Sequence, residues 1–533
     1  MELNLELPPQ VDFILDTLES SGYQAYIVGG AVRDLMIKRP SNYDYDFTTD
    51  ATPEQILKLF PDSFYENNFG TVMVTHEDIN QQMGLSEVED QEWQHHNLHN
   101  GTPTVAQSKL KPWRERIVDL DKADKIHASL VDDDLIDDLG EQKLGIASLD
   151  SLPNYEITTF RSDGAYQDHR RPNEVTWGKN LKEDVDRRDF TINALALKKL
   201  SQDAGKRDNK HRYQVIDYHD GIKDIEDKVV RTVGDPNLRF KEDSLRMLRA
   251  IRFSVQLNME IEEDTFTAIE AHSQLIKHVS WERIRDEFLK ILESDYPAEG
   301  VELLEDTRLL EYIIPELLEG KGVEQGGHHI TDVWTHSIEA LRETPAIDPI
   351  VRLATLLHDV AKPRTYALRD GDITFYNHEI VGSRMASKIA KRLRLSNKDI
   401  QRVFTLVRHH MFHYQPHNTD SAIRRFMRKV GLANVDDILD LREGDRLGSG
   451  AKRTSWRLEE MKQRMIEQLN QPMEVKDLKI NGNDLMTEFD LKPGKILGEI
   501  LNNLFEYVMD DPKLNNREDL LKLAKKYLES VTI

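Results

Sequence analysis

The run Gly29-Gly30-Ala31-Val32-Arg33-Asp34, followed by Asp44-Tyr45-Asp46, is the stretch of sequence that decides the fold. The apolar residues Tyr26-Ile27-Val28 before it predict a short strand, and residues 31–37 after the glycines predict a helix. Glycine lets the backbone approach a phosphate, and a helix N-terminus favours an anion. Arg33 adds a forked donor for phosphate oxygens. The pattern therefore indicates a phosphate-binding turn, although a glycine pair alone is equally typical of a plain tight turn.

Asp44 and Asp46 lie in a β-prone run from Tyr43 to Thr48. Residues two apart on a strand point to the same face, so the two carboxylates should converge. Hard oxygen ligands suit Mg²⁺, and metal ions held in this way can activate a hydroxyl group and stabilise a leaving group. The alternative is a pair of solvated turn aspartates. Glu156, on a predicted strand from 155 to 160, is either a third carboxylate of the site or an ordinary exposed strand residue.

These motifs resemble the head of the class II tRNA nucleotidyltransferase and poly(A) polymerase family, which belongs to the polymerase β-like nucleotidyltransferases. Tyr45 departs from the smaller aliphatic residue or Phe that is usual in the family, and we expect it to face the opposite side of the strand. The further matching motifs occur in the family's order: Ala51-Thr52-Pro53-Glu54, Thr158-Thr159-Phe160-Arg161 with Asp163-Gly164 and Arg170-Arg171-Pro172, residues 187–194, residues 242–252, and Asn481-Gly482-Asn483-Asp484-Leu485-Met486 with Lys492-Pro493-Gly494 and Asp510-Asp511-Pro512.

The resemblance implies an α+β fold: a small head with a mixed sheet and helices, then a long all-α body. It implies transfer of CMP and AMP from CTP and ATP to the tRNA 3′ end, without a nucleic-acid template. Alternatives that share the head motifs are a poly(A) polymerase and an enzyme that adds only CC or only A. The resemblance implies Mg²⁺ binding by Asp44 and Asp46 and catalysis by Asp44, Asp46 and Arg188. The residues implied in nucleotide binding are Gly30, Arg33, Arg188, Asp243, Arg246, Arg249 and Arg252.

Asp243, Arg246, Arg249 and Arg252 recur every three residues, which predicts one stripe on a helix that starts at about residue 242. Cytosine and adenine both present an amino donor beside a ring-nitrogen acceptor, whereas uracil and guanine present the opposite order. A carboxylate at Asp243 can accept from the amino group, and a guanidinium at Arg246 can donate to the ring nitrogen. The stripe is therefore a candidate base-reading surface. The alternative is a solvated, salt-bridged helix face.

A second set of residues resembles the HD phosphohydrolase domain, whose ligands are His, His-Asp and a distant Asp. His336, His358, Asp359 and Asp445 match these ligands, and His378 with His409 or His410 could extend the site to a second metal. Imidazole and carboxylate together suit Mn, Ni, Fe or Zn. The alternative is that these histidines cap and pack helices. Similar HD domains in some bacterial tRNA nucleotidyltransferases act on phosphates at tRNA ends, so the resemblance implies a possible second activity.

The motifs predict four parts: a nucleotidyltransferase head at 11–200, a helical neck with the base-reading helix at 201–320, an HD domain at 325–450, and a helical tRNA-binding tail at 451–533. Residues 77–154 carry 17 acidic and 7 basic residues and predict an acidic insertion in the head. Residues 384–429 carry 12 Lys and Arg against 2 acids, interleaved with aromatics, and predict a nucleic-acid surface. A charged outer helix face is the alternative.

The 533-residue composition narrows these possibilities. The net charge of −24 argues against a generic nucleic-acid binder, so a basic surface for RNA must be local. The absence of cysteine excludes disulfides, thiolate metal sites and thiol nucleophiles. The chain has no apolar run long enough for a membrane span and no signal-peptide pattern at Met1-Glu2-Leu3-Asn4, so we expect a cytoplasmic enzyme. A phosphohydrolase with a degenerate head and a non-enzymatic RNA scaffold are the remaining rivals, and the complete metal motifs disfavour both.

Overall fold

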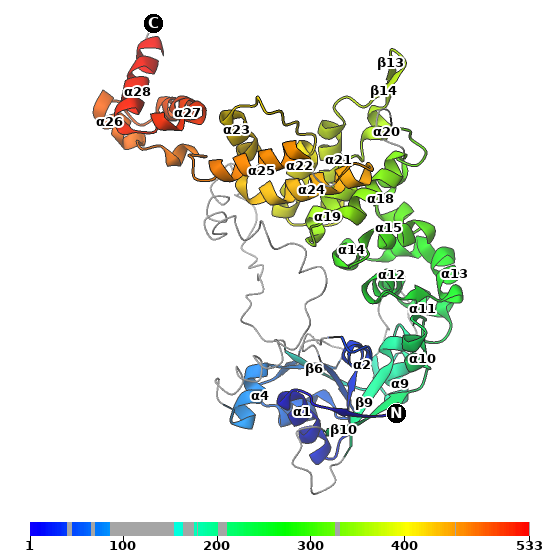
Figure 1. Cartoon of the computed structure of the whole chain (residues 1–533). Helices are drawn as coiled ribbons and strands as arrows, with labels where there is room; N and C mark the ends of the chain where they lie inside the picture. The colour runs from blue at the N-terminus through cyan, green and yellow to red at the C-terminus, as the bar shows by residue number, and fades with distance from the viewer. Residues whose placement is uncertain are drawn as a thin grey trace. The chain divides into compact units, whose positions relative to one another are not determined.

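The computed structural model describes residues 1–39, 45–65, 70–85, 154–163, 175–178, 180–200, 211–325, 331–452 and 455–531. The described chain divides into two compact units. The head unit contains the described residues up to Pro315, and the helical unit contains those from Glu316 onward. Figure 1 shows the strands gathered at the N-terminal end of the chain and helices over most of the remainder.

The head unit is built on an eight-stranded mixed sheet with the order β1-β10-β9-β2-β3-β6-β5-β4. Only β3 and β6 pair in parallel; the other neighbours are antiparallel. The strands are β1 (Glu2–Leu5), β2 (Ala25–Val28), β3 (Asp46–Thr49), β4 (Phe64–Tyr65), β5 (Thr71–Val74), β6 (Tyr155–Thr159), β9 (Leu195–Lys199) and β10 (His211–Asp217). Two small pairs are β7 (Arg161–Asp163) with β8 (Val175–Trp177), and β11 (Val229–Val230) with β12 (Glu260–Ile261).

Both faces of the central strand β2 are buried, which explains its unbroken apolar sequence. Ile27 of β2 belongs to the larger core, together with Leu15 and Phe47, whereas Val28 belongs to a smaller core with Phe160 on the other face. The helices of this part are α1 (Pro9–Ser20), α2 (Gly30–Met36), α3 (Pro53–Leu59), α4 (His76–Met83) and α9 (Leu181–Asp186). A capping box in which Thr52 N donates to Gln55 Oε1 (2.8 Å) starts α3.

The rest of the head unit is helical and centres on α12 (Leu245–Leu257), which packs against α14 and α15. The other helices here are α10 (Gly221–Glu226), α11 (Pro236–Glu242), α13 (Glu263–His272), α14 (Trp281–Glu293), α15 (Pro297–Asp306) and α16 (Leu310–Ile313), with α17 (Pro315–Leu318) at the boundary of the two units.

The helical unit contains α18 (Val333–Glu343), α19 (Pro349–Leu357), α20 (Lys362–Thr365), α21 (His378–Arg392), α22 (Asn397–His409), α23 (Asp420–Val430), α24 (Val435–Gly448), α25 (Trp456–Gln468), α26 (Gly482–Phe489), α27 (Lys495–Asp510) and α28 (Arg517–Val531), with the hairpin β13 (Ala367–Arg369) and β14 (Asp372–Thr374). The last three helices share a separate apolar core that includes Leu485, Leu504 and Leu520. Among the described residues, no helix is long and apolar enough to cross a membrane.

The predicted fold class is confirmed, with three corrections in detail. The body that follows the predicted head at 11–200 is not all helical, because β10 belongs to the main sheet. The predicted acidic insertion begins with an ordered helix, α4, which packs on α1, and residues 86–153 lie outside the described part of the chain. The helix predicted from residue 242 is interrupted, since α11 ends at Glu242 and α12 begins at Leu245. The matching Arg170-Arg171-Pro172 also lies outside the described residues.

Candidate functional site

The glycine turn between β2 and α2 brings a carboxylate and a guanidinium close to the backbone. Gly29 has a φ of 80°, which favours glycine. A Cβ at Gly29 would lie 2.9 Å from Arg188 Nη1 and 3.6 Å from Asp46 Oδ2. Gly30 is the first residue of α2. A Cβ added to it would lie 3.5 Å from Arg33 Nη2. The turn therefore leaves room for Asp46 and Arg188 that a larger residue would take.

Asp46 and Glu156 are paired residues on the parallel strands β3 and β6. Paired residues on adjacent strands point to the same face, so the two carboxylates lie on one face of the sheet. Asp46 is partly exposed and Glu156 is exposed. Asp44 lies outside the described residues, and Tyr45 is buried in the head core, as expected from its place beside the strand.

Arg33 is buried and held by two partners. Its Nε donates to Asp34 Oδ1 (2.9 Å) and its Nη1 donates to Asn193 Oδ1 (2.7 Å). Arg188 lies nearby, with Nη1 donating to the Asn193 carbonyl (3.4 Å) and Nη2 within 3.6 Å of Asp184. Asn193 was not assigned a role from the sequence. Asn193 positions both arginines. Its place in the 187–194 motif is the sequence feature that could have identified it as a site residue.

Asp189 and Glu287 hold the arginines of α12. Asp189 Oδ2 accepts from Arg249 Nε (2.7 Å), and Glu287 accepts from Arg252 Nη1 (3.2 Å). Burial would raise the pKa of Asp189, but the Arg249 guanidinium outweighs it and lowers the pKa to about 2. Burial lowers the pKa of Arg252 to about 10, against the opposing charge of Glu287. Asp189 and both guanidinium groups are therefore charged at neutral pH, and Phe253 packs under both guanidinium groups.

Asp243 and Arg246 lie close in sequence but have separate partners. Asp243 lies in the break between α11 and α12, where its carboxylate accepts from Leu245 N (3.1 Å) and from Arg283 Nη2 (2.7 Å). Arg246, on α12, donates to Glu242 Oε2 (2.6 Å) and to the Arg187 carbonyl (3.0 Å). The predicted stripe is thus correct for the three arginines and wrong for Asp243. An aspartate that bonds the backbone two residues on favours a turn over a helix interior.

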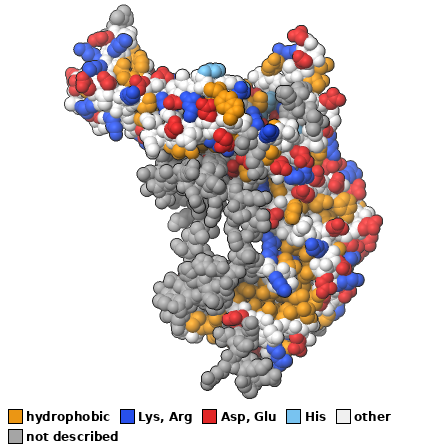
Figure 2. Space-filling view, viewed as in Figure 1, with side chains coloured by type: hydrophobic (Ala, Val, Ile, Leu, Met, Phe, Trp, Pro, Cys, Tyr) orange, Lys and Arg blue, Asp and Glu red, His pale blue; other side chains and the backbone are white. Residues whose placement is uncertain are grey.

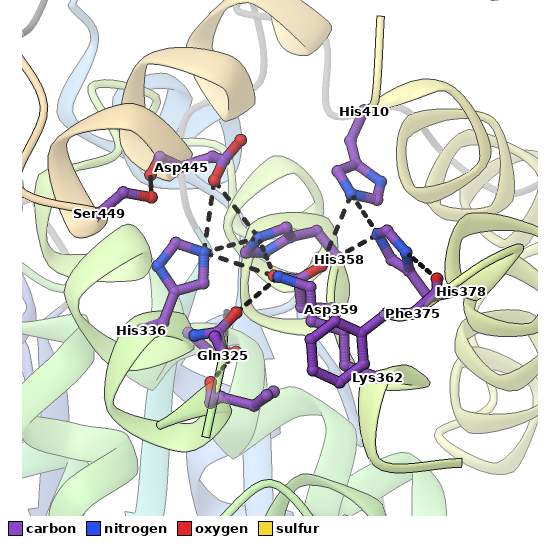
Figure 3. Close-up of polar contacts among 12 residues, drawn as sticks. Gln325, His336, His358, Asp359, Lys362, Phe375, His378, His410, Asp445 and Ser449 are labelled. Atoms are coloured by element: carbon purple, nitrogen blue, oxygen red, sulfur yellow. Dashed lines mark hydrogen bonds and ion pairs between the residues drawn. The ribbon is translucent and has the colours of Figure 1, made fainter. Parts of the chain in front are cut away.

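Six buried side chains of the helical unit converge on one place (Figure 3). Three of their ligand atoms, from His336, His358 and Asp445, lie within 4.8 Å of one another. The same holds for a second group, formed by Asp359, His378 and His410. His336 Nε2 lies 3.1 Å from His358 Nε2 and 3.3 Å from Asp445 Oδ1. The structure brings together all four predicted ligands of this site.

The histidines of the cluster face one another through their Nε2 atoms, with 3.1 Å between His336 and His358 and 3.3 Å between His378 and His410. The Nδ1–H groups of His358, His378 and His410 donate to the carbonyls of Thr355 (2.7 Å), Phe375 (2.8 Å) and Val407 (2.8 Å). These bonds turn each Nε2 toward the cluster, where the neutral ring offers a lone pair to a metal; this is the usual arrangement in a metal-binding histidine. Ligand atoms about 3.0–3.4 Å apart suit metal–ligand bonds of about 2.1 Å. The donor set thus fits a divalent metal, and of the two adjacent histidines His410, not His409, faces the cluster.

The electrostatics of the cluster favour a cation. Burial would raise the pKa of Asp445, but hydrogen bonding by His336 and the charge of His358 hold it well below its usual range. Burial would likewise raise the pKa of Asp359, but His358 and Lys362 outweigh it and lower it strongly; Lys362 Nζ lies 2.6 Å from Asp359 Oδ2. Burial would lower the pKa of His358, but the neighbouring carboxylates raise it. Both carboxylates are therefore ionised and available as ligands.

Two glycines seat α24, which carries Asp445, against α18, which carries His336. A Cβ at Gly444 would lie 2.3 Å from Thr344 Oγ1 and 2.6 Å from the Ala340 carbonyl. A Cβ at Gly448 would lie 2.5 Å from Ala340 N. The two helices thus approach backbone to backbone, and this close approach sets the position of Asp445.

A cavity of about 600 Å³ opens beside the cluster. Its walls include the ligand residues Asp359, His378, His410 and Asp445 and the cations Lys362, Arg442 and Arg446. Arg442 Nη1 donates to Asp445 Oδ2 (2.6 Å), and the buried Nε of Arg446 has no hydrogen-bond partner among the described residues. The cavity can therefore receive an anion next to the cluster.

Much of the predicted basic surface at 384–429 is compensated by acids. Arg424 is buried and donates to the Met509 carbonyl (2.7 Å). Arg425 and Arg428 both approach Glu506, at 3.3 and 3.4 Å. On the face shown in Figure 2, Lys and Arg side chains lie among Asp and Glu. The excess of basic residues in this segment therefore partly serves packing within the helical unit.

Three protein-family models match the chain. The poly A polymerase head domain matches residues 25–111 and 114–231. The probable RNA and SrmB-binding site of polymerase A matches residues 258–320, and a putative tRNA nucleotidyltransferase domain 2 matches residues 376–524.

Similar proteins agree with these matches. A CCA-adding enzyme of Ligilactobacillus salivarius is 30% identical over 97% of this chain and 96% of its own length. An A-adding tRNA nucleotidyltransferase of Deinococcus radiodurans is 35% identical over 61% of this chain and 75% of its own length. The crystal structure of the Bacillus stearothermophilus CCA-adding enzyme in complex with CTP has the same fold, with a TM-score of 0.61, 22% identity and coverage of 99% of this chain and 100% of that one. The chain belongs to the tRNA nucleotidyltransferase family that contains these CCA-adding and A-adding enzymes.

Proposed function

We propose that the head unit transfers CMP and AMP from CTP and ATP to the 3′ end of tRNA, with release of pyrophosphate and without a nucleic-acid template. The observation that carries the proposal is the approach of Asp46 and Arg188 to the Gly29 turn. The full-length similarity to a CCA-adding enzyme supports it. Because the substrate is tRNA, we expect the enzyme to act in the cytoplasm.

Enzymes of this family generally use a divalent metal, and we propose Mg²⁺ held by Asp44 and Asp46. The pairing of Asp46 with Glu156 supports an oxygen-rich site and makes Glu156 a candidate third ligand. The metal would supply charge stabilisation for the reacting phosphate. Arg188 would bind the triphosphate beside Gly30 and Arg33.

Asp243 and Arg246 would read the base, and Arg249 and Arg252 would hold the triphosphate. In the structure Asp243 pairs with Arg283, and Arg246 pairs with Glu242. Base reading thus requires both side chains to exchange these partners for the amino group and ring nitrogen of cytosine or adenine. Arg246→Ala should loosen the choice of CTP and ATP over UTP and GTP, and an unchanged preference would refute this role.

The test of the main proposal is the length of the product. The protein is incubated with tRNAs that lack one, two or three 3′ nucleotides and with each labelled triphosphate. We expect each tRNA to be completed to CCA. Long A tracts would show a poly(A) polymerase, and addition of A alone to the tRNA lacking one nucleotide would show an A-adding enzyme like the Deinococcus radiodurans relative. Asp44→Ala should abolish incorporation while tRNA still binds.

We propose a second activity for the helical unit: hydrolysis of phosphate esters at an HD-type site formed by His336, His358, Asp359 and Asp445. The facing Nε2 atoms of His336 and His358 support metal binding, and the ring of His358 is fixed by a bond from its Nδ1 to the Thr355 carbonyl. Mn, Ni, Fe or Zn suits this donor set and would supply Lewis acidity to a phosphate ester and its attacking water. His378 and His410 would complete a second metal position.

In this hydrolysis a water oxygen forms a bond to phosphorus, the ester P–O bond breaks, and the ester oxygen leaves with a proton. Arg442 and Arg446 line the cavity and would bind the phosphate oxygens. The activity is tested by measuring bound metal and the release of phosphate from nucleoside 3′-phosphates. We expect His358→Ala to lose both while nucleotide incorporation continues. Equal phosphate release by the variant would exclude this site.

The predicted parts follow as proposals. The head and neck carry incorporation, residues 325–450 carry the HD site, and residues 451–533 bind tRNA. The separate apolar core of α26, α27 and α28 supports the tail as an independent binding module.

A further inference from the structure

A second cavity, of about 390 Å³, adjoins the cavity beside the cluster of histidine and aspartate side chains. Both cavities have Glu379 and Met411 in their walls, so they open side by side. The second cavity contains none of the six cluster residues. Its walls come from the end of α22, the segment from 411 to 419, α23 and Met461 of α25.

Two aromatic rings form one wall of this second cavity. Phe412 and Phe426 are partly exposed, and their ring centroids lie 4.9 Å apart at an interplanar angle of 50°. Partly exposed aromatic rings beside cations are the usual platform on which single-stranded nucleic acid stacks a base. If apolar side chains of the protein filled this cavity, the two rings would be buried.

The charges around the rings favour an anionic occupant. Lys429, Arg408, His409 and His413 line the cavity, and Glu379 is its one acidic wall residue. Arg408 Nη1 lies 3.4 Å from Glu379 Oε1, which offsets that acid. Lys429 is exposed, so its ammonium is accessible to a phosphate.

Arg442 connects the two cavities. Its guanidinium lies 5.7 Å from the centroid of the Phe412 ring and also donates to Asp445 of the metal cluster. A phosphate bound at the cluster and a base bound on Phe412 would thus contact opposite sides of one side chain.

We propose that Phe412, Phe426 and Lys429 form a nucleotide-binding subsite for the residue that precedes the terminal phosphate of a single-stranded RNA 3′ end. The proposal rests on the phosphohydrolase function given above. The terminal phosphate lies at the metal cluster, the preceding base stacks on the rings, and the linking phosphate pairs with Lys429. A nucleoside 3′-phosphate carries this base but lacks the linking phosphate, so the contact with Lys429 makes the reaction selective for oligonucleotides over mononucleotides, without reading the sequence.

The test compares a 3′-phosphorylated trinucleotide with a nucleoside 3′-phosphate, using full-length protein. Turnover of each is measured with metal present, and binding of the fluorescent trinucleotide is measured by anisotropy with EDTA present. We expect Phe426→Ala and Lys429→Glu each to weaken trinucleotide binding about tenfold. Lys429→Glu should also lower the preference for the trinucleotide in kcat/KM by a similar factor, whereas Phe426→Ala should lower kcat/KM for both substrates alike. Lys398→Glu, an exposed charge reversal on α22 away from both cavities, is the matched control and should change neither quantity.

The outcomes separate the two proposals. Absence of phosphate release from both substrates, with trinucleotide binding that depends on Lys429, would overturn the phosphohydrolase function and keep the subsite. Phosphate release with equal kcat/KM for both substrates, or binding unaffected by both variants, would overturn the subsite and keep the phosphohydrolase. Lys429→Glu is exposed and should not disturb folding, so it decides the result if Phe426→Ala proves unstable.

Discussion

The buried Asp189 carboxylate and the partly exposed Arg249 guanidinium form an ion pair that fixes α12 beside the glycine turn, with 2.7 Å between Arg249 Nε and Asp189 Oδ2. The same carboxylate accepts from Asn193 Nδ2 (3.3 Å), and Asn193 in turn accepts from Arg33. One chain of hydrogen bonds therefore connects Arg249 and Arg33, which are both proposed to bind the triphosphate. A substitution of Asp189 should therefore alter the positions of both arginines.

Asp189→Asn should remove a pH-dependent part of the stability. The pKa of Asp189 is about 2 in the folded protein, against an ordinary value of 3.8. Because the folded pKa is depressed, the stabilisation is complete above about pH 4 and is lost as the pH falls toward 2. Between about pH 6 and pH 3, the free energy of unfolding of the wild type should therefore fall by about 1 kcal/mol more than that of the variant. Denaturant unfolding at both pH values measures this, and a constant difference would contradict it.

Gly29→Ala should impair nucleotide incorporation more than it impairs folding. The φ of 80° and the 2.9 Å approach to Arg188 Nη1 require the backbone or Arg188 to move. We expect a loss of about 1–2 kcal/mol in stability and a fall of at least about tenfold in incorporation. Gly22→Ala is the matched control, because Gly22 has a φ of 89° and open space around it. Equal incorporation by the two variants would exclude a role for the turn.

Gly444→Ala should disturb the helical unit without affecting the head chemistry. The added methyl would meet Thr344 Oγ1 at 2.3 Å and the Ala340 carbonyl at 2.6 Å. Overpacking of this kind costs about 1–3 kcal/mol and should push Asp445 away from His336, so bound metal should fall. Gly498→Ala on α27, where nothing lies within 4 Å, serves as the control. Metal analysis and thermal unfolding measure both effects, and full metal content in a destabilised Gly444 variant would argue against this route.

The local signals in the sequence located the elements that carry their own caps and turns. Strand β2 and helix α2 occur within one residue of their predicted bounds, because the glycine turn between them is a local feature. The box at Thr52 and Gln55 likewise fixed the start of α3. The approach of Asp46 to Arg188 also follows from motifs that the sequence displays.

The sequence could not locate elements whose conformation depends on distant partners. Strand β9 reads Leu-Ala-Leu-Lys-Lys, which are helix-favouring residues, and it is a strand because β2 and β10 pair with its two edges. Asp243 follows the helical spacing of its neighbours, yet its bonds to Leu245 N and Arg283 place it in a break. Arg283 and Glu287 lie 40 and 35 residues from the charges they pair with, so only the fold identifies them.

After bound metal is removed, different ions should restore the two proposed activities. Carboxylates alone favour a hard ion, whereas a set of histidines and carboxylates favours a transition metal. After chelation, Mg²⁺ should restore nucleotide incorporation but not phosphate release, and Mn²⁺ or Ni²⁺ should restore phosphate release. His358→Ala should respond to Mg²⁺ as the wild type does in incorporation and should release no phosphate with any ion. Restoration of phosphate release by Mg²⁺ alone would show that the reaction does not use the histidine cluster, because the Nε2 atoms of His336 and His358, 3.1 Å apart, suit a softer ion.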